Sequence, residues 1–436
     1  MAIPFLVKKW LVRTGVARHL PVARRLTGDG ADFLKYYSDK VLAAPIEELI
    51  DPGTFPEAPA CDVVNLNLAA PRFESPVSGT RVTADRTGLP PACGLKTLRA
   101  AIAERNSPRS DDEVLITHGA SGAYASVLDA FLNPGRKVVQ FDPSSPLFSL
   151  GALSRRATIR WIPTTTEDGR LRFDADRLAK SLRGATLLAL ADPGNPTGGT
   201  LAPEDQEKIA WAAKRADVLI YLDESFARFR FDGPANRLPS LPDAAGRTLV
   251  AGSLTHGDGL GSIRVGWLSG PKHLVRACAL TASLNAPYVP TICQQIALRA
   301  LQADEELFGP VQEEFRARRR YAFDKLRSMG LDPSWPAGGF FFWVPVSSFG
   351  MDGRTFAERL LNERKVFVGP GTAFGPSGAN FVRISFAVED GRLREGLARL
   401  AAFVESIGGK PNAPAPRSAR EPQPELEEVP PAFSRV

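Results

Sequence analysis

The chain has 436 residues, 44% of them hydrophobic, which is enough to bury a large core divided over two domains. Its net charge of +6 equals the six basic residues that precede the first acidic residue, so the remainder is balanced and gives no sign of a nucleic-acid-binding groove. No apolar run reaches the roughly 18 residues of a membrane-spanning helix. The cysteines have neither a CxxC pair nor another metal-ligand spacing, which is typical of reduced cysteines in a cytoplasmic protein; they are Cys61, Cys93, Cys278 and Cys293.

Residues 1–60 precede the motifs described below and form a basic N-terminal extension. Its start, MAIPFLVKKWLVRTGVARHLPVARRL, is too basic and too poor in a central apolar run for a secretory signal. We expect an arm that packs on the body of the protein or on a partner subunit. Two alternatives stay open, a helix in weak contact with a membrane surface and a transit peptide.

The middle of the chain alternates short apolar runs with polar or glycine-rich turns, which predicts an α/β fold. Strands are expected in EVLIT, RKVVQFD, ATIRWIPT, ATLLALA, ADVLIYLD and TLVAGS, and a helix in AYASVLDAFL. Ligands of such sheets collect at the carboxyl ends of the strands. The polar residues at these ends are therefore candidates for a site: Thr117, Asn195, Asp223 and Ser253.

The pattern changes after about residue 300. A charged helix in EEFRARRRYAFDKLRSMG leads to a strand in PAGGFFFWVPV, another strand is expected in NFVRISFAVED, and a last helix follows. We therefore expect a large domain over residues 61–300, whose first part also contributes to the second domain, and a smaller α+β domain over residues 301–408. Residues 409–436 are rich in Pro, Ala and Glu and are expected to be disordered.

Taken together, these segments resemble the class I/II aminotransferases, the aspartate-aminotransferase-like branch of the fold type I enzymes that use pyridoxal 5'-phosphate (PLP). The resemblance covers roughly Val63 to Ile407 and rests on DPGNPTGG, LDESF, SLTH…GSIRVGW and NFVRISFA, which have the family's order and spacing. It implies a large domain with a mostly parallel, seven-stranded sheet between helices, a smaller α+β domain, and a homodimer.

The resemblance also implies a phosphate site. The loop in THGASG opens a helix, whose free N–H groups and dipole favour an anion. Ala120 and Ser121 would hold the cofactor phosphate there, and Ser253, Thr255 and Arg264 would complete the cup. Taken singly, each of these residues could equally be a helix cap or a surface arginine.

Three further roles follow from the resemblance. Asp223 would pair with the pyridine nitrogen of the cofactor, Asn195 would bond its 3' oxygen, and Arg383 would grip the α-carboxylate of the substrate with two hydrogen bonds. The structural alternatives are a helix cap for Asp223, turn chemistry for Asn195 and a solvated edge arginine for Arg383.

The sequence departs from the family at four places. His256 stands where the family has the lysine that tethers PLP, Ser145 where an aromatic ring stacks on the cofactor, and Phe226 where a tyrosine bonds the 3' oxygen; TADRTGLPPACG lacks the usual tyrosine. An imidazole cannot replace the tether, but with a pKa near 6.5 it can move a proton. We therefore expect PLP, pyridoxamine 5'-phosphate (PMP) or a PLP–amino acid adduct to bind without a covalent link.

In this hypothesis His256 is the acid/base at the α-carbon of a carboxylate-bearing amino substrate, and ordinary transamination is doubtful. Deoxysugar dehydratases of fold type I offer a parallel, since they have a histidine in place of the lysine and use PMP. Two alternatives remain. The pocket could catalyse a PLP-independent reaction on a phosphorylated or carboxylated small molecule, or the chain could be a pseudoenzyme that acts as a scaffold. We expect no metal site.

Overall fold

The computed structural model describes residues 62–67, 71, 73, 75, 88–105, 110–303 and 305–408, without the side chains of residues 305–307. The predicted N-terminal arm and Pro-rich tail lie outside these residues. Among the described residues, no helix has the length and apolar character needed to cross a membrane.

The main element of the fold is one large mixed sheet, which confirms the predicted α/β class. Five neighbouring strands, β8, β7, β6, β3 and β4, run parallel, and β9 is antiparallel to both of its neighbours. The order across the sheet is β2 (Val114–Thr117), β9 (Gly266–Ser269), β8 (Thr248–Ser253), β7 (Leu219–Asp223), β6 (Leu187–Ala191), β3 (Lys137–Asp142), β4 (Thr158–Glu167) and β5 (Arg170–Phe173).

The sheet has eight strands instead of the expected seven, because β4 turns back into β5. Asp168 and Gly169 join the two strands with φ values of 47° and 74°. A two-residue turn with both φ values positive matches the twist of an antiparallel hairpin, and Asp-Gly is a favoured pair for it. The sequence TTTEDGRLRF contained this signal.

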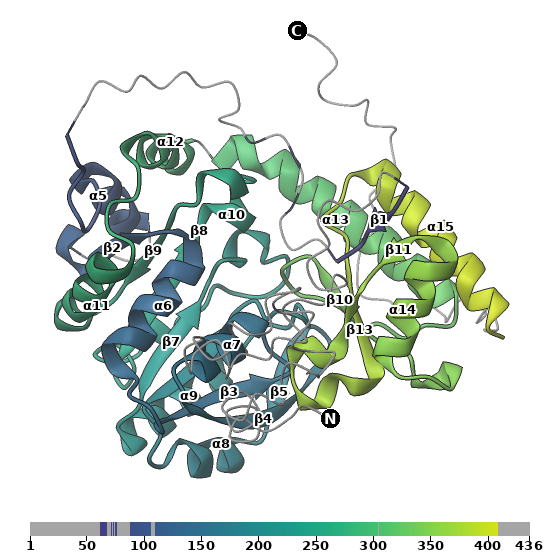
Figure 1. Cartoon of the computed structure of the whole chain (residues 1–436), viewed down its shortest axis with the longest axis horizontal. Coiled ribbons are helices and arrows are strands. Elements are labelled where there is room, and N and C mark those ends of the chain that lie inside the picture. The colour runs from purple at the N-terminus through teal and green to yellow at the C-terminus, as the bar shows by residue number, and fades with distance from the viewer. Residues whose placement is uncertain are drawn as a thin grey trace, which may run out of the picture.

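Helices cover both faces of the sheet (Figure 1). One face packs on α6 (Gly119–Phe131), α7 (Pro146–Ser154) and α11 (Lys272–Asn285), and the other on α8 (Ala175–Leu182) and α9 (Pro203–Ala216). In β6, Leu187 and Ala189 belong to the first core, whereas Leu188 and Leu190 belong to the second. This alternation explains why the strands are apolar throughout instead of alternating with polar residues.

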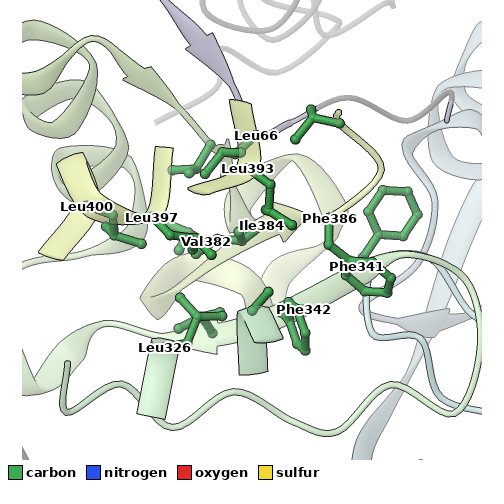
Figure 2. Close-up of a cluster of buried hydrophobic side chains, with 14 of the residues drawn as sticks. Leu66, Leu326, Phe341, Phe342, Val382, Ile384, Phe386, Leu393, Leu397 and Leu400 are labelled. Carbon is green, nitrogen blue, oxygen red and sulfur yellow. The ribbon is translucent and has the colours of Figure 1, made fainter. Parts of the chain in front are cut away.

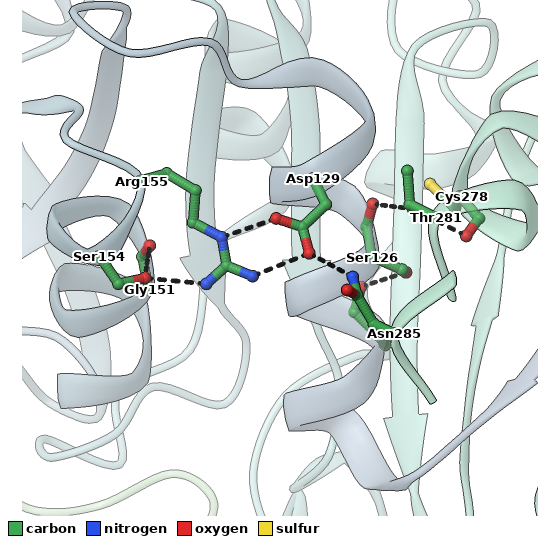
Figure 3. Close-up of polar contacts among 9 residues, drawn as sticks. Ser126, Asp129, Gly151, Ser154, Arg155, Cys278, Thr281 and Asn285 are labelled. Atoms are coloured by element: carbon green, nitrogen blue, oxygen red, sulfur yellow. Dashed lines mark hydrogen bonds and ion pairs between the residues drawn. The ribbon is translucent and has the colours of Figure 1, made fainter. Parts of the chain in front are cut away.

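Polar contacts connect the three helices of the first face (Figure 3). The Arg155 guanidinium, at the end of α7, makes two bonds of 2.9 and 3.0 Å to the Asp129 carboxylate in α6. Asn285 Nδ2, at the end of α11, donates to the same carboxylate over 2.8 Å, and Thr281 Oγ1 donates to the Ser126 carbonyl over 2.9 Å. These bonds fix α6, whose first residues lie at the candidate site.

The C-terminal part contains a three-stranded antiparallel sheet of β10 (Phe341–Pro345), β13 (Phe381–Ser385) and β12 (Gly369–Pro370). The early strand β1 (Val64–Asn65) pairs with β11 (Val366–Phe367). Leu66, Leu326, Phe342 and Leu397 share one core with these strands (Figure 2). The helices around them are α13 (Glu305–Ser328), α14 (Gly353–Arg364) and α15 (Asp390–Ser406); α5 (Lys96–Arg105) and α12 (Thr291–Gln302) pack beside β2 and β9.

The C-terminal part closes over the carboxyl ends of the large sheet. The Asp142 carboxylate, at the end of β3, accepts hydrogen bonds from the Ser377 backbone N–H and from its hydroxyl, the latter over 2.8 Å. The Ser144 N–H donates to the Phe374 carbonyl over 2.8 Å. Burial raises the pKa of Asp142, and the two bonds from Ser377 oppose that rise. This contact covers the edge where the candidate site residues lie.

Candidate functional site

Three of the predicted phosphate-site residues, Ser253, Thr255 and Arg264, lie beside the start of α6. Gly119 has a φ of +71°, and a Cβ atom there would lie 2.5 Å from Nη2 of Arg264, so glycine is required for the arginine to approach. Arg264 Nη1 donates to Thr255 Oγ1 over 2.9 Å. Ser253 Oγ accepts the Thr255 N–H over 3.0 Å and caps the short helix α10 (Leu254–Gly257).

The cup formed in this way is electropositive. Ala120 and Ser121 stand in the first turn of α6, where backbone N–H groups have no partner within the helix. The Arg264 guanidinium adds a full positive charge beside them, and both Arg264 and Ser121 are exposed in the single chain. Ser121 Oγ lies 3.4 Å from the His118 carbonyl oxygen. A dianionic group such as a phosphate fits these donors.

Asp223 provides a negative charge deeper in the sheet. It is the last residue of β7, it is only 6% exposed, and its carboxylate accepts the Ser225 N–H over 2.9 Å. Burial raises its pKa, opposed by the two hydrogen bonds from Ser225. No cation of the described residues forms an ion pair with it. A carboxylate buried in this way is costly unless a ligand supplies a cationic N–H donor.

Arg383 is the converse case, a buried guanidinium with no acid beside it. Its Nη1 donates to Asn195 Oδ1 over 2.9 Å, and its Nη2 donates to Asn67 Oδ1 over 2.6 Å. The guanidinium lies 4.3 Å from the ring centre of Phe341 and 4.7 Å from that of Phe374. Burial lowers its pKa to about 9. Its Nε has no hydrogen-bond partner among the described residues, so an anion could still be bound there.

His256 lies on α10, flat against an aromatic side chain. Its imidazole stacks on Phe226, with ring centres 4.5 Å apart and an angle of 25° between the planes. Phe226 in turn packs edge-on against Phe340 and Phe341, at 5.3 and 5.6 Å. Because Phe341 also touches Arg383, a continuous set of rings connects the histidine to the Arg383 guanidinium.

The remaining predicted positions fit the same edge of the sheet. Ser145 is half-buried at the start of α7, next to the segment that meets Phe374. No lysine of the described residues belongs to α10 or to the carboxyl end of a strand of the large sheet; those in ion pairs are on α9 and α11. Within the described ranges, no group of three His, Cys, Asp or Glu residues could hold a metal ion.

The sequence did not predict three residues that contact the Arg383 guanidinium. Asn67 comes from a segment more than 300 residues earlier, and only the proximity of that segment to β13 brings it to the guanidinium. Phe341 and Phe374 are two of the 25 phenylalanines in the chain. The alternation in NLNL was the one local signal for Asn67, because it indicates a short strand in this segment.

Comparisons with known proteins show the family of the chain. Residues 63–400 match the family model for aminotransferase class I and II. The putative aminotransferase YugH of Bacillus subtilis is 30% identical over 318 residues, which are 71% of this chain and 82% of that protein. The arginine–pyruvate transaminase AruH of Pseudomonas aeruginosa is 30% identical over 80% of this chain and 92% of its own.

Solved structures show the same fold. The crystal structure of an aromatic aminotransferase from Pyrococcus horikoshii superposes with a TM-score of 0.73 at 26% identity, over 80% of this chain and 97% of that one. An aspartate aminotransferase from Thermus thermophilus, solved with maleate, gives a TM-score of 0.72 at 25% identity, over 78% and 91% of the two chains.

Proposed function

Because the chain belongs to the class I and II aminotransferase family, we propose that it binds PLP, PMP or a PLP–amino acid adduct without a covalent bond. PLP is the cofactor of the aminotransferases in this family. When bound, it supplies a ring that accepts the electrons released at the α-carbon of an amino acid. The observation that carries the proposal is the buried Asp223 carboxylate, which has no cation partner among the described residues.

The residues present fit such a group at three points. Asp223 would pair with a protonated ring nitrogen, which relieves the cost of its burial. The cup of Ala120, Ser121, Ser253, Thr255 and Arg264 would hold the phosphate. Asn195 would offer its side-chain N–H to the 3' oxygen, since its Oδ1 already accepts from Arg383.

We assign the substrate carboxylate to Arg383. Its burial, its lowered pKa and its unused Nε all favour an anion at this place. The Thermus thermophilus relative was solved with maleate, a dicarboxylate, which supports a carboxylate ligand in this fold. The proposed substrate is therefore a small amino compound with a carboxylate.

His256 is the proposed acid/base at the substrate α-carbon. Its imidazole stands on the helix that also carries Thr255 of the phosphate cup, and it stacks on Phe226 beside the Arg383 pocket. An imidazole accepts and returns a proton near neutral pH, but it does not form the covalent link of a lysine amine. We therefore expect proton exchange at the α-carbon and little ordinary transamination.

We also propose a homodimer. Four large apolar side chains are exposed on and between α11 and α12, namely Leu280 (65%), Leu284 (78%), Tyr288 (39%) and Ile292 (41%). Leu280 and Leu284 are four residues apart and share a face of α11, and exposed apolar residues that lie together mark an interaction surface. A second copy would cover them, and light scattering at micromolar concentration should give the mass of a dimer. A monomer would contradict this part of the proposal.

Equilibrium dialysis with PMP tests cofactor binding. Because PMP has no aldehyde, it cannot form an imine with a lysine, and the experiment measures non-covalent binding alone. We expect saturable binding by the native chain and weaker binding by Asp223→Asn and by Arg264→Gln. Asp243→Asn is the control, since it breaks the ion pair with Lys214 of α9, away from the site, and should leave binding unchanged. No binding at millimolar PMP or PLP would contradict the proposal and favour a PLP-independent enzyme or a scaffold.

A further inference from the structure

A close ion pair lies behind the His256–Phe226 stack. Arg228 belongs to the short helix η4 (Ala227–Phe229), two residues after Phe226, and Asp258 ends α10, two residues after His256. Arg228 Nη1 contacts Asp258 Oδ1, and the side chains are 14% and 7% exposed. The pair thus joins the two segments that carry the stacked rings.

The surroundings of this pair make it rigid. The Arg228 guanidinium lies 4.3 Å from the ring centre of Phe308 in α13, and Gln312 Nε2 of the same helix donates to the Arg228 carbonyl over 2.6 Å. A Cβ atom at Gly257 would lie 3.3 Å from Arg228 Cβ, so the backbone of α10 packs directly on the arginine side chain. The ion pair therefore connects α10 to α13 as well as to η4.

This connection matters because α10 has only four residues. A single helical turn is not stable by itself, since the cost of ordering it exceeds what one or two hydrogen bonds return. Ser253 caps its first turn, and the Arg228–Asp258 pair holds its last residues. The His256 imidazole, which stacks on the Phe226 ring, thus belongs to a turn that is held at both of its ends.

We infer that Arg228 and Asp258 are positioning residues for His256, which they hold on the Phe226 ring in the orientation needed at the reacting carbon. The catalytic meaning of this inference rests on the proposed function. Neither residue acts on the substrate itself. Their effect is on the rate, because a displacement of about 1 Å in a reacting group can cost on the order of 100-fold.

The stack gives a direct spectroscopic readout that needs no cofactor. The chain has only four histidines, so the imidazole signals of protein labelled with 13C-histidine can be assigned with the help of His256→Gln. Ring protons over an aromatic face are shifted upfield. We expect such a shift for His256 in the native chain, and its loss in Asp258→Asn and in the double variant Arg228→Met/Asp258→Leu. The double variant removes both charges of the pair together, so that neither member is left buried without the other.

The same variants should exchange the α-proton of L-amino acids in D2O, with saturating PLP, roughly 10- to 100-fold more slowly than the native chain. PMP affinity should change by less than about threefold, since none of the changed residues belongs to the phosphate cup or to Asp223. The control Asp243→Asn should alter neither the shift nor the rate.

His256 signals that keep their native positions in both variants would overturn the inference. Loss of the upfield shift together with a native exchange rate would overturn it as well. A native chain that shows the shift, loses it in the variants and yet exchanges no α-proton would sustain the positioning role and contradict the proposed function.

Discussion

The two ends of the candidate site, at Arg264 and at Arg383, differ in chemistry from its middle, where His256 lies on Phe226. At the ends, the guanidinium groups of Arg264 and Arg383 donate hydrogen bonds to neighbouring side-chain oxygens. These bonds orient the two positive charges, as a site for anions requires. In the middle, His256 and Phe226 stack on each other, and Ser145 has no ring that could stack on a cofactor. In the proposed function the ends would hold a phosphate and a carboxylate, whereas no lysine of the described residues lies in the middle to form a covalent tether. Binding strength would therefore come from the ends and from Asp223.

Asp223 and Arg383 show the same principle with opposite sign. Burial raises the pKa of the carboxyl and lowers that of the guanidinium to about 9, and in neither case does a described residue of opposite charge compensate. A fold does not keep two such groups for stability, because each costs free energy when it is charged and unpaired. A ligand with a cationic ring and a carboxylate would satisfy both.

The largest expected effect is in the middle of the site. His256→Ala should slow α-proton exchange of amino acids by about 10²- to 10⁴-fold, the usual contribution of a general acid/base. PMP affinity should remain nearly native, because the phosphate cup and Asp223 are untouched. Deuterium incorporation followed by proton NMR measures the rate. If binding fell as much as the rate, the division between ends and middle would be wrong.

Asp223→Asn should weaken PMP binding and yet stabilise the ligand-free protein. The raised pKa of the native carboxyl means that the folded state loses stability as pH rises above the ordinary Asp value and through the raised one. The variant has no such loss. Its melting temperature should exceed the native one by a few degrees at pH 8 and by little at pH 4.

The neighbouring Glu224 has to be neutralised in that experiment. Burial raises its pKa to about 8, with further contributions from Asp192 and from Asp223 itself, so the comparison is made with Glu224→Gln in both proteins. A difference in melting temperature that did not change with pH would show that Asp223 does not carry an uncompensated charge.

Ser145→Phe should increase the affinity for PMP only slightly. A stacked ring contributes about 0.5–1.5 kcal/mol beyond its buried area, which corresponds to PMP binding about 2- to 12-fold tighter. Calorimetric titration can resolve this gain, with Ser149→Phe on the same helix as the control for added bulk. Weaker binding would indicate that the space beside Ser145 is already filled.

Removal of residues 410–436 should have the smallest effect. Their composition lets them contribute little to a core, so the melting temperature should stay within about 2 °C of the native value. A larger decrease in a thermal scan would mean that this segment packs on the folded part.

The sequence predicted most of the strands, because these depend on local patterns, and the proximity of Ser253, Thr255 and Arg264 to the start of α6 followed from the resemblance. The apolar runs ending at Thr117, Asp223 and Ser253 form strands, and the polar residues after them meet at one edge. It did not reveal Asn67 at the Arg383 guanidinium or the Arg228–Asp258 pair. These contacts join segments that are 30 to more than 300 residues apart, and charged or amide side chains alone do not indicate their partners.

The central claim is that this site holds its cofactor without a covalent bond. Incubation with PLP, reduction with borohydride and intact-mass measurement test it directly, with dialysis of an unreduced sample in parallel. We predict native mass after reduction, PLP bound before dialysis and removed by it, and a mass increase at the new lysine in His256→Lys. Reduction that fixes PLP to the native chain at a specific lysine, or a native chain that takes up no PLP at millimolar concentration, would contradict the claim.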